Sequence, residues 1–240
     1  MQKKSMSKEY LNIADLMTGM MMVFLLIAVA FMLDVEASKK EIERQRDAMA
    51  EIALVAERSR LQLRQELLEE FEDNLEGWNA EILEDNTVRF NAPNVLFKTG
   101  KSTLRARFKT ILNDFFPRYI KILRHYEQEI KAIRIEGHTS SDWLNAKKMT
   151  TRYLNNVELS QRRALATMKY CYGRTSVTDD GRDWLIKVLR ANGLSFAQLI
   201  LKSDKSEDAK KSRRVEFKVV TKAEEKLHQI LELERSRSNQ

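Results

Sequence analysis

A single acidic residue, Asp15, lies at the edge of the most apolar stretch of the chain. From Leu16 to Leu33 the eighteen residues LMTGMMMVFLLIAVAFML carry no charge, and Leu11–Ala14 extend the run beyond the acid. A carboxylate inside a membrane costs on the order of 2.5–3.5 kcal/mol at mid-span and less towards the ends. Facing a partly hydrated path, such a group can take up and release a proton. Position alone leaves a second interpretation open, in which Asp15 caps a helix at headgroup level.

The apolar run predicts a membrane-spanning helix over residues 11–33. At 1.5 Å per residue this segment reaches about 34 Å, enough to cross a bilayer. It ends in bulky residues rather than at a small-residue cleavage site, which favours an anchor over a cleaved signal. Three lysines precede it within residues 1–10, and acidic residues follow it directly. This asymmetry predicts a cytoplasmic tail over 1–10, a single pass through a bacterial inner membrane and a periplasmic remainder.

The composition limits the classes of protein that come into question. The 240 residues are 43% hydrophobic and 32% charged, which excludes a protein with many membrane spans. With 7 Gly and 2 Pro, turns are few and helices should dominate. The net charge of +7 raises the question of nucleic acid. Acidic residues are interleaved with the basic ones and no aromatic-basic motif occurs, so we expect no nucleic-acid partner.

Residue types that would indicate a metal centre, a cofactor or an enzyme are scarce. The lone cysteine, Cys171, excludes an intrachain disulfide and is typical of a packing residue. The three histidines are far apart in sequence, so we expect no metal site. No nucleophile–His–acid arrangement and no Gly-rich phosphate loop occurs. We therefore expect neither enzymatic activity nor a bound cofactor.

The segment 34–80 predicts a long helical connector. It has no Pro, its one Gly is Gly77, and it is rich in strong helix formers. Apolar residues recur at spacings of three, four and seven, at Ile42, Met49, Ile52, Leu63, Leu67, Phe71 and Leu75. This seam predicts a parallel dimeric coiled coil, with a single helix packed on its own domain as the alternative. About forty helical residues would reach about 60 Å from the bilayer.

Residues 81–222 predict an α+β domain. The expected strands are Val88–Phe90, Asn94–Phe97, Ile130–Glu136, Phe196–Lys202 and Val215–Val220. Leu104–Tyr126 predicts an amphipathic helix, and Ser160 is the expected N-cap of a second one. The tail, residues 223–240, carries scattered apolar residues on a charged background and predicts a further helix.

The residues around Asp15 resemble a known signature. Residues 14–21, ADLMTGMM, are similar to the A-D-[FLM]-[MV]-T-[AG]-[ML]-M pattern of MotB-type stator subunits. The resemblance implies that Asp15 carries a proton, with sodium as the alternative ion, and that Thr18 and Gly19 permit close helix packing. It also implies a dimer of this chain inside a ring of five MotA-like partner subunits.

Four motifs in the second half of the chain resemble those of OmpA-like peptidoglycan-binding domains. They are VLFKTGKSTL at 95–104, IEGHT at 135–139, NVELSQRRA at 156–164 and SRRVE at 212–216, in the order of that family. The resemblance implies a small α/β sandwich that binds the cell wall. The expected architecture is therefore a single N-terminal transmembrane helix, a long coiled-coil-like helical connector and a C-terminal OmpA-like sandwich, an α+β protein overall.

The same resemblance implies which residues meet peptidoglycan. They are Thr139, Ser140, Asp142, Asn156, Leu159, Arg163 and Arg214. With Ser160 as N-cap, Arg163 falls in the first helical turn, where its guanidinium and the helix N-terminus can both hold a stem-peptide carboxylate. Two alternatives stay open: either arginine of SRRVE, Arg213 or Arg214, as a solvated edge charge, and His138 and Thr139 as turn residues at the end of a strand.

One position departs from the OmpA-like pattern. After Gly-His-Thr the family has an aspartate that meets the ammonium of diaminopimelate, whereas this chain has Ser140, followed by Ser141 and Asp142. Either Asp142 substitutes for that aspartate or recognition differs. The segments around Trp143 and Trp184 are longer than the family's usual connections, and these tryptophans are either packing residues or partner contacts.

Among stator proteins, the chain is more similar to the ZorB-type subunits of Zorya antiphage systems than to flagellar ones. The similarity lies in the short tail, in MMMVF at 20–24 after the aspartate motif, and in GHTSS at 137–141 ahead of Trp143. It implies a proton-driven rotary motor that contains a MotA-like partner, ZorA, and senses phage attack. A flagellar MotB-type stator subunit and a passive membrane-to-wall tether are the alternatives.

Overall fold

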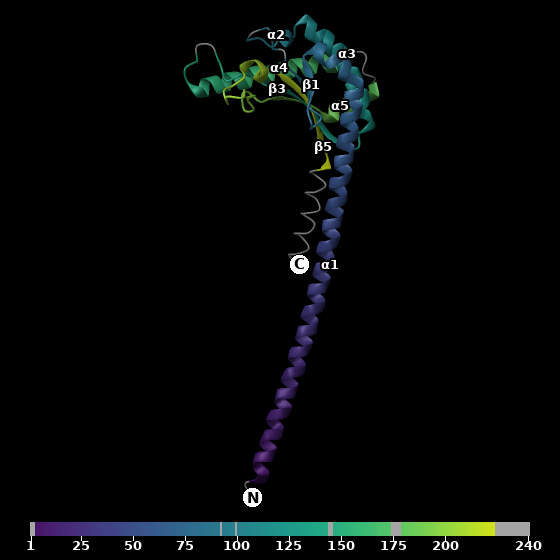
Figure 1. Ribbon diagram of the computed structural model, residues 1–240, viewed down its shortest axis with the longest axis vertical. Helices are drawn as coiled ribbons and strands as arrows, with labels where there is room; N and C mark the ends of the chain where they lie inside the picture. The colour runs from purple at the N-terminus through teal and green to yellow at the C-terminus, as the bar shows by residue number, and fades with distance from the viewer. Residues whose placement is uncertain (1–2, 92, 99, 144–145, 174–178, 224–240) are drawn as a thin grey trace. The chain divides into compact units, whose positions relative to one another are not determined.

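The computed structural model describes the backbone of residues 3–91, 93–98, 100–143, 146–173 and 179–223 (Figure 1). Side chains are described from Ala14 onwards, with further gaps at 93–94 and 179–180. The chain divides into two compact units, residues 1–52 with 230–240 and residues 53–229. Each unit is described by itself. The tail expected to be helical, from 224 onwards, lies outside the described residues.

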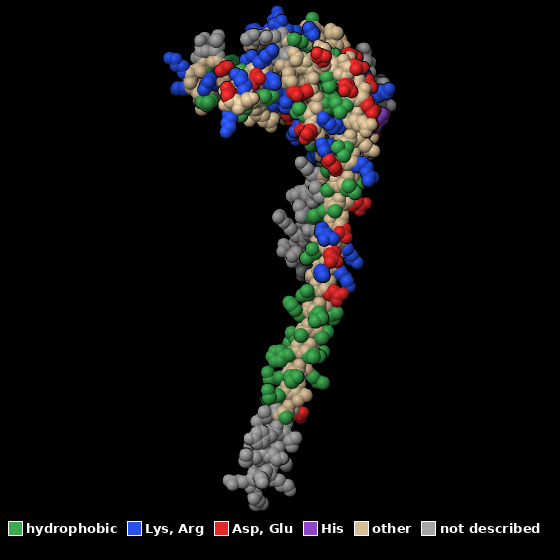
Figure 2. Space-filling model, viewed as in Figure 1, with side chains coloured by type: hydrophobic (Ala, Val, Ile, Leu, Met, Phe, Trp, Pro, Cys, Tyr) green, Lys and Arg blue, Asp and Glu red, His purple; other side chains and the backbone are tan. Residues whose placement is uncertain are grey.

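One helix, α1 (Lys3–Trp78), contains both the expected span and the expected connector. The side chains of residues 14–33 are all exposed and form a nearly continuous apolar surface (Figure 2). An apolar surface of this extent is typical of a segment that meets lipid or protein. Within the described part of the chain, α1 is the helix that is long and apolar enough to cross a membrane, as the sequence predicts.

The last turns of α1 belong to the folded domain. Leu63, Leu67 and Phe71 are buried in its hydrophobic core, with exposed fractions of 3%, 0% and 0%. From Leu63 onwards the heptad-like seam therefore packs on its own domain, and the coiled-coil prediction is wrong for that stretch. Ile42 is 64% exposed, so the prediction of a coiled coil now concerns residues 42–52 alone.

The domain is built on a five-stranded mixed sheet of order β1-β2-β5-β3-β4. The strands are β1 (Ala80–Ile82), β2 (Val88–Phe90), β3 (Ile130–Gly137), β4 (Leu189–Gly193) and β5 (Val215–Thr221). β3 and β4 pair in parallel and the other neighbours are antiparallel. The helices are α2 (Pro93–Leu96), α3 (Ala106–His125), α4 (Met149–Tyr172), α5 (Asp179–Val188) and α6 (Ala209–Ser212). The predicted α+β sandwich is confirmed.

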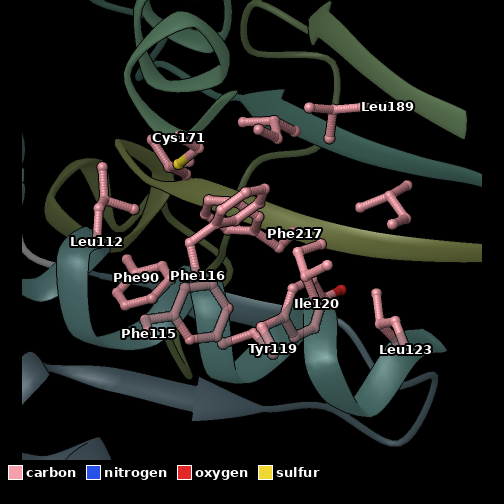
Figure 3. Close-up of a cluster of buried hydrophobic side chains, with 14 of the residues drawn as sticks. Phe90, Leu112, Phe115, Phe116, Tyr119, Ile120, Leu123, Cys171, Leu189 and Phe217 are labelled. Carbon is pink, nitrogen blue, oxygen red and sulfur yellow. The ribbon is translucent and has the colours of Figure 1, made fainter. Parts of the chain in front are cut away.

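One face of the sheet is apolar and packs against α3. Side chains alternate between the two faces of a strand, so every second residue of β5 points to this side. Phe217 lies at its centre, with its ring centroid 5.1 Å from that of Phe115 and 5.8 Å from that of Phe90 (Figure 3). Cys171 of α4 is fully buried in the same core, which confirms its role in packing.

The opposite face of the sheet carries a row of charged residues. The strand register places Arg89 of β2 beside Glu216 of β5, and Glu216 beside Glu136 of β3. Glu136 and Glu216 are 6% and 4% exposed. In the segment between β4 and β5, Arg214 Nη1 donates to the carbonyl of Gln198 at 3.0 Å. Charges buried in this way must be paired to be stable.

Two of the expected strands are wrong. Asn94–Phe97 lies largely in the helical turn α2, because Pro93 favours the first position of a helix, and only Phe97 forms a bridge, to Leu104. Phe196–Lys202 follows Ser195, whose φ of 53° breaks the extended chain, and forms turns with one bridge at Leu201. The strand of this region is β4, which lies inside the segment read as a long connection.

Candidate functional site

Ser160 lies inside helix α4 rather than at its start. The helix begins at Met149, so the expected N-cap at Ser160 is wrong. The Ser160 hydroxyl instead donates to the carbonyl of Val157 at 2.9 Å and accepts from the N–H of Ser195 at 3.0 Å. It ties the chain after β4 to the middle of α4. The N-terminus of α4, at Met149, is therefore not beside Arg163.

Two glycines let the sheet approach α4 closely. A Cβ on Gly137 would lie 2.4 Å from the carbonyl oxygen of Ser160, and one on Gly193 would lie 2.3 Å from the backbone nitrogen of Gln161. The Gln161 side chain closes this contact, because its Oε1 accepts from the N–H of Gly193 at 2.7 Å. The ends of β3 and β4 are thus held against the middle of α4, where several of the expected wall-binding residues lie.

Arg163 and Arg213 are neighbouring cations, and we call them the open arginine pair. Arg163 is 8% exposed, its Nε donates to the carbonyl of Lys101 at 3.0 Å, and its guanidinium carbon lies 5.0 Å from the Phe97 ring centroid. Burial, and then the charge of Arg213, lower the pKa of Arg163 to about 10. Neither guanidinium has a carboxylate within 4.0 Å among the described side chains. A buried cation without a counter-ion favours the binding of an anion.

The loop after β3 meets this pair and α4. The Ser140 hydroxyl is buried and accepts from Arg213 Nη1 at 3.4 Å. Asn156, 1% exposed, donates from Nδ2 to the carbonyl of Asp142 at 3.3 Å, while the side chain of Asp142 is exposed. Ser140 thus occupies the interior position next to an arginine, and Asp142 lies on the outside of the same loop.

Thr139 and Leu159 complete the set expected from the sequence. The N–H of Thr139 donates to the carbonyl of Ser195 at 2.8 Å, and its Oγ1 is buried without a hydrogen-bond partner in the described part of the chain. Leu159 is 5% exposed and lies in the interior. The structure therefore brings five expected residues, Thr139, Ser140, Asp142, Asn156 and Leu159, to the region where β3 ends and α4 passes.

Arg214 has a different environment. Its Nε donates to Glu216 Oε1 at 2.6 Å, and it is 4% exposed, so the alternative of a solvated edge charge is wrong. Burial lowers the pKa of Arg214, and the charge of Glu216 offsets part of that effect. The residue that sequence reasoning left out is Arg213. Its signal was the pair of arginines in SRRVE, since neighbouring residues of an extended chain point to opposite sides.

A buried acid–base cluster surrounds Glu216, and we define it by Arg89, Arg214, Glu216, Glu136 and His138. Arg89 Nε lies 2.7 Å from Glu216 Oε1, and His138 Nε2 lies 3.3 Å from Glu216 Oε2 and 3.9 Å from Glu136 Oε2. His138 directly follows the end of β3 and is 1% exposed, so its side chain is a buried member of this cluster. The strand register brings Glu216 of β5 to Glu136 and His138, which lie far from it in sequence.

The two carboxyl groups of this cluster differ in their proton affinity. Burial would raise the pKa of Glu216, but the neighbouring imidazole of His138 and the ion pair with Arg214 outweigh burial and lower it. The pKa of Glu136 is raised, chiefly by burial, because His138 compensates only in part. Glu216 is therefore the fixed anion of the cluster.

The two tryptophans in the longer segments have different surroundings. Trp184 of α5 is 8% exposed, and the guanidinium carbon of Arg124 lies 5.5 Å from the centroid of the Trp184 ring. It is a packing residue. Trp143 is only partly buried and is the last described residue before a gap in the structure.

Comparison with known proteins gives two kinds of match. Residues 96–214 match the model of the OmpA family. The protein named Zorya protein ZorB from Escherichia coli is 40% identical over 232 residues, which cover 96% of this chain and 95% of that protein.

Solved structures are more distant. The cell wall anchor of the T6SS from Pseudomonas aeruginosa is 22% identical, with a TM-score of 0.45 over 65% of this chain and 96% of that one. A putative MotB like protein from Desulfovibrio vulgaris is 22% identical, with a TM-score of 0.46 over 68% of this chain and 91% of that one. The assignment rests on the sequence relative and on the domain match. The chain belongs to the ZorB family of Zorya proteins, and its OmpA-family domain contains the sites described above.

Proposed function

We propose that this chain is the wall-anchored, ion-carrying stator subunit of a rotary motor that serves Zorya antiphage defence. Membership of the ZorB family supports the defence role. The apolar part of α1 supports a place in the inner membrane, with the N-terminus in the cytoplasm and the OmpA-family domain in the periplasm. Two copies of this chain inside a ring of five MotA-like ZorA subunits would form the motor.

Asp15 is the proposed ion carrier. It is the one ionisable residue among residues 14–33, and its side chain is exposed on the surface of α1. The Thr18 hydroxyl donates to the carbonyl of Ala14 at 2.8 Å, so it is satisfied within the helix. A Cβ on Gly19 would meet nothing within 4 Å, which leaves room for a partner helix. In lipid, a carboxylate placed in this way needs a protein or water partner, which the ring would supply.

The open arginine pair is the single observation that carries the wall-binding half of the proposal. Arg163 and Arg213 lie together, partly or fully buried, and neither guanidinium has a carboxylate within 4.0 Å among the described side chains. A stem-peptide carboxylate would complete them with charge-assisted hydrogen bonds. The hydroxyl of Ser140, in the loop after β3, and the amide of Asn156, which contacts that loop from α4, add neutral hydrogen-bonding groups.

Replacement of Asp15 by asparagine tests the ion-carrying role. Asp15→Asn keeps the shape of the side chain and removes its ability to exchange a proton. We expect normal membrane levels and normal assembly with ZorA, and phage protection reduced to that of cells without the system. The measurement is the efficiency of plaque formation, with the complex quantified after gentle detergent extraction.

Asp34→Asn is the matched control, since Asp34 is the first acid after the apolar run. It should keep full protection. Full protection in Asp15→Asn would overturn the stator proposal and favour a passive tether. Replacing sodium in the medium by potassium distinguishes the two ions, because a proton-driven motor should keep its protection.

A further inference from the structure

Glu216 presents its two oxygens to different groups in the buried acid–base cluster. Its Oε1 accepts from Arg89 at 2.7 Å and from Arg214 at 2.6 Å. Its Oε2 faces Nε2 of His138 at 3.3 Å. His138 is 1% exposed, and neither of its ring nitrogens has a hydrogen bond of good geometry within the described part of the chain. Buried polar groups normally have a hydrogen-bond partner, so a buried imidazole without one indicates a partner from outside the chain.

We propose that His138, Glu136 and Glu216 form a site for a divalent transition-metal ion, with Zn²⁺ the best fit. Each residue offers one ligand atom, and the three atoms lie within 4.8 Å of one another. Tetrahedral Zn²⁺ with bonds of about 2.0–2.2 Å places its ligand atoms about 3.3–3.6 Å apart. The separation of 3.3 Å between His138 and Glu216 already meets this requirement. The separation of 3.9 Å from His138 to Glu136, in a set that extends over up to 4.8 Å, requires a rotation of the Glu136 side chain.

The surrounding groups support a site with three protein ligands. Arg89 and Arg214 hold Oε1 of Glu216 and so fix the direction of Oε2, as hydrogen-bonded outer groups commonly do for ligating carboxylates. In the strand register Asn192 of β4 lies beside Glu136, and its Oδ1 has no partner in the described part of the chain. One nitrogen and carboxylate oxygens are a donor set that Zn²⁺ accepts readily.

The charges of the cluster also admit such an ion. With His138 neutral, the two carboxylates of the cluster balance its two guanidinium groups. Glu81, which lies outside the cluster and pairs with Arg89 at 3.3 Å, adds one negative charge. A divalent cation with one anionic fourth ligand brings this total to zero. An uncompensated ion in so buried a place would be strongly disfavoured.

The position of the site indicates what the ion would do. Glu136 lies near the end of β3, His138 follows that strand, and Thr139 and Ser140 are the next residues along the chain. An ion that joins β3 to Glu216 of β5 would fix the start of the loop that meets the open arginine pair. The inference rests on the cluster geometry and does not depend on the proposed function.

Zinc titration of the full chain tests the site directly. The chain is purified in detergent without a histidine tag, treated with chelator and titrated with ZnCl₂ in a calorimeter. We expect one ion per chain and a rise of about 5–10 °C in the melting temperature of the domain at a hundredfold excess over Kd. Glu136→Gln should weaken zinc binding at least tenfold, because it removes a ligand that has no arginine partner among the described side chains.

The matched control is His125→Gln. His125 is an exposed histidine 3.2 Å from Glu66, with a single acid beside it, and its loss should leave zinc binding unchanged. X-ray absorption spectroscopy at the zinc edge of zinc-loaded wild type does not depend on a folded variant. It should show one imidazole with oxygen ligands. Absence of binding by wild type, equal binding by Glu136→Gln, or a sulfur ligand would overturn the proposal and leave an ion-pair network only.

Discussion

Arg213 and Arg214 are adjacent in sequence, yet they belong to clusters of opposite kind. Arg214 donates to Glu216 at 2.6 Å, in a cluster where each arginine has a carboxylate. Arg213 meets the hydroxyl of Ser140 and the cation Arg163, in a pair that has no carboxylate among the described side chains. Removing one partner of a buried ion pair destabilises the fold, whereas an unpaired buried charge favours the binding of a counter-ion. The comparison separates residues needed for folding from residues needed for wall binding.

Removal of Arg214 should produce the largest loss of stability. Arg214→Met leaves Glu216 buried with Arg89 as its remaining arginine partner. Breaking a buried pair by removing one partner costs about 3–5 kcal/mol in the free energy of unfolding. The measurement is denaturant unfolding of the domain in the full chain, followed by tryptophan fluorescence.

Arg213→Met is the control for this comparison, because it removes the adjacent cation from the unpaired cluster. Its free energy of unfolding should change by less than about 1 kcal/mol, as for most partly exposed residues without a special role. Equal losses in the two variants would show that the two arginines do not differ as their partners indicate.

The open arginine pair should show the opposite behaviour, a loss of binding with little loss of stability. Arg163→Met keeps an apolar side chain against the Phe97 ring and removes the charge. A hydrogen bond to a charged group is worth about 1.5–3 kcal/mol, so affinity for purified peptidoglycan should fall about tenfold to 150-fold. Co-sedimentation with the full chain measures this effect.

The neighbouring Arg162 provides a matched control for Arg163. It is exposed and pairs with Glu158 at 3.0 Å on the outside of α4, so Arg162→Met should bind the wall as wild type does. Unchanged binding by Arg163→Met would transfer the wall contact to other residues. Loss of binding together with a large loss of stability would place Arg163 among the residues needed for folding.

Much of this fold follows from local patterns in the sequence. The apolar run after Asp15, the amphipathic helix α3 and strands β2, β3 and β5 were all predictable, because each has its own hydrophobic period. β4 was not, since LRANG has few β-formers and becomes a strand by pairing with β3. The close contact of Gly137 with Ser160 likewise depends on two segments that meet only in the folded domain.

The candidate sites were predictable only in part, for the same reason. The residues of the loop after β3 and of α4 could be named from their motifs. Which arginine of SRRVE faces these residues depends on the backbone conformation at Arg213. The start of α4 at Met149 is not preceded by a residue that caps it through its side chain, so the sequence does not indicate it. The histidine–glutamate cluster joins Glu136 to Glu216 through the register of two strands, which spacing in sequence does not reveal.

An ion pair between β5 and the turn that joins β1 to β2 should give the smallest effect, and it is a reference for the buried acid–base cluster and the open arginine pair. Lys218 of β5 lies 3.1 Å from Asp85 of that turn, and both side chains are partly open to solvent. Burial would raise the pKa of Asp85, but the hydrogen bonds of Thr87 and the charge of Lys218 outweigh it and hold the pKa below its ordinary value. Because the pKa of Asp85 is lowered in the folded state, the stability that the pair contributes is present above the unfolded pKa, near 3.9, and is lost as the pH falls through the folded-state pKa.

Asp85→Asn should therefore lower the free energy of unfolding by about 0.2–1 kcal/mol at pH 7 and leave it unchanged at a pH below the folded-state pKa. A loss at pH 7 as large as that of Arg214→Met would mean that pairing on this strand, and not burial, determines the contribution of its charges.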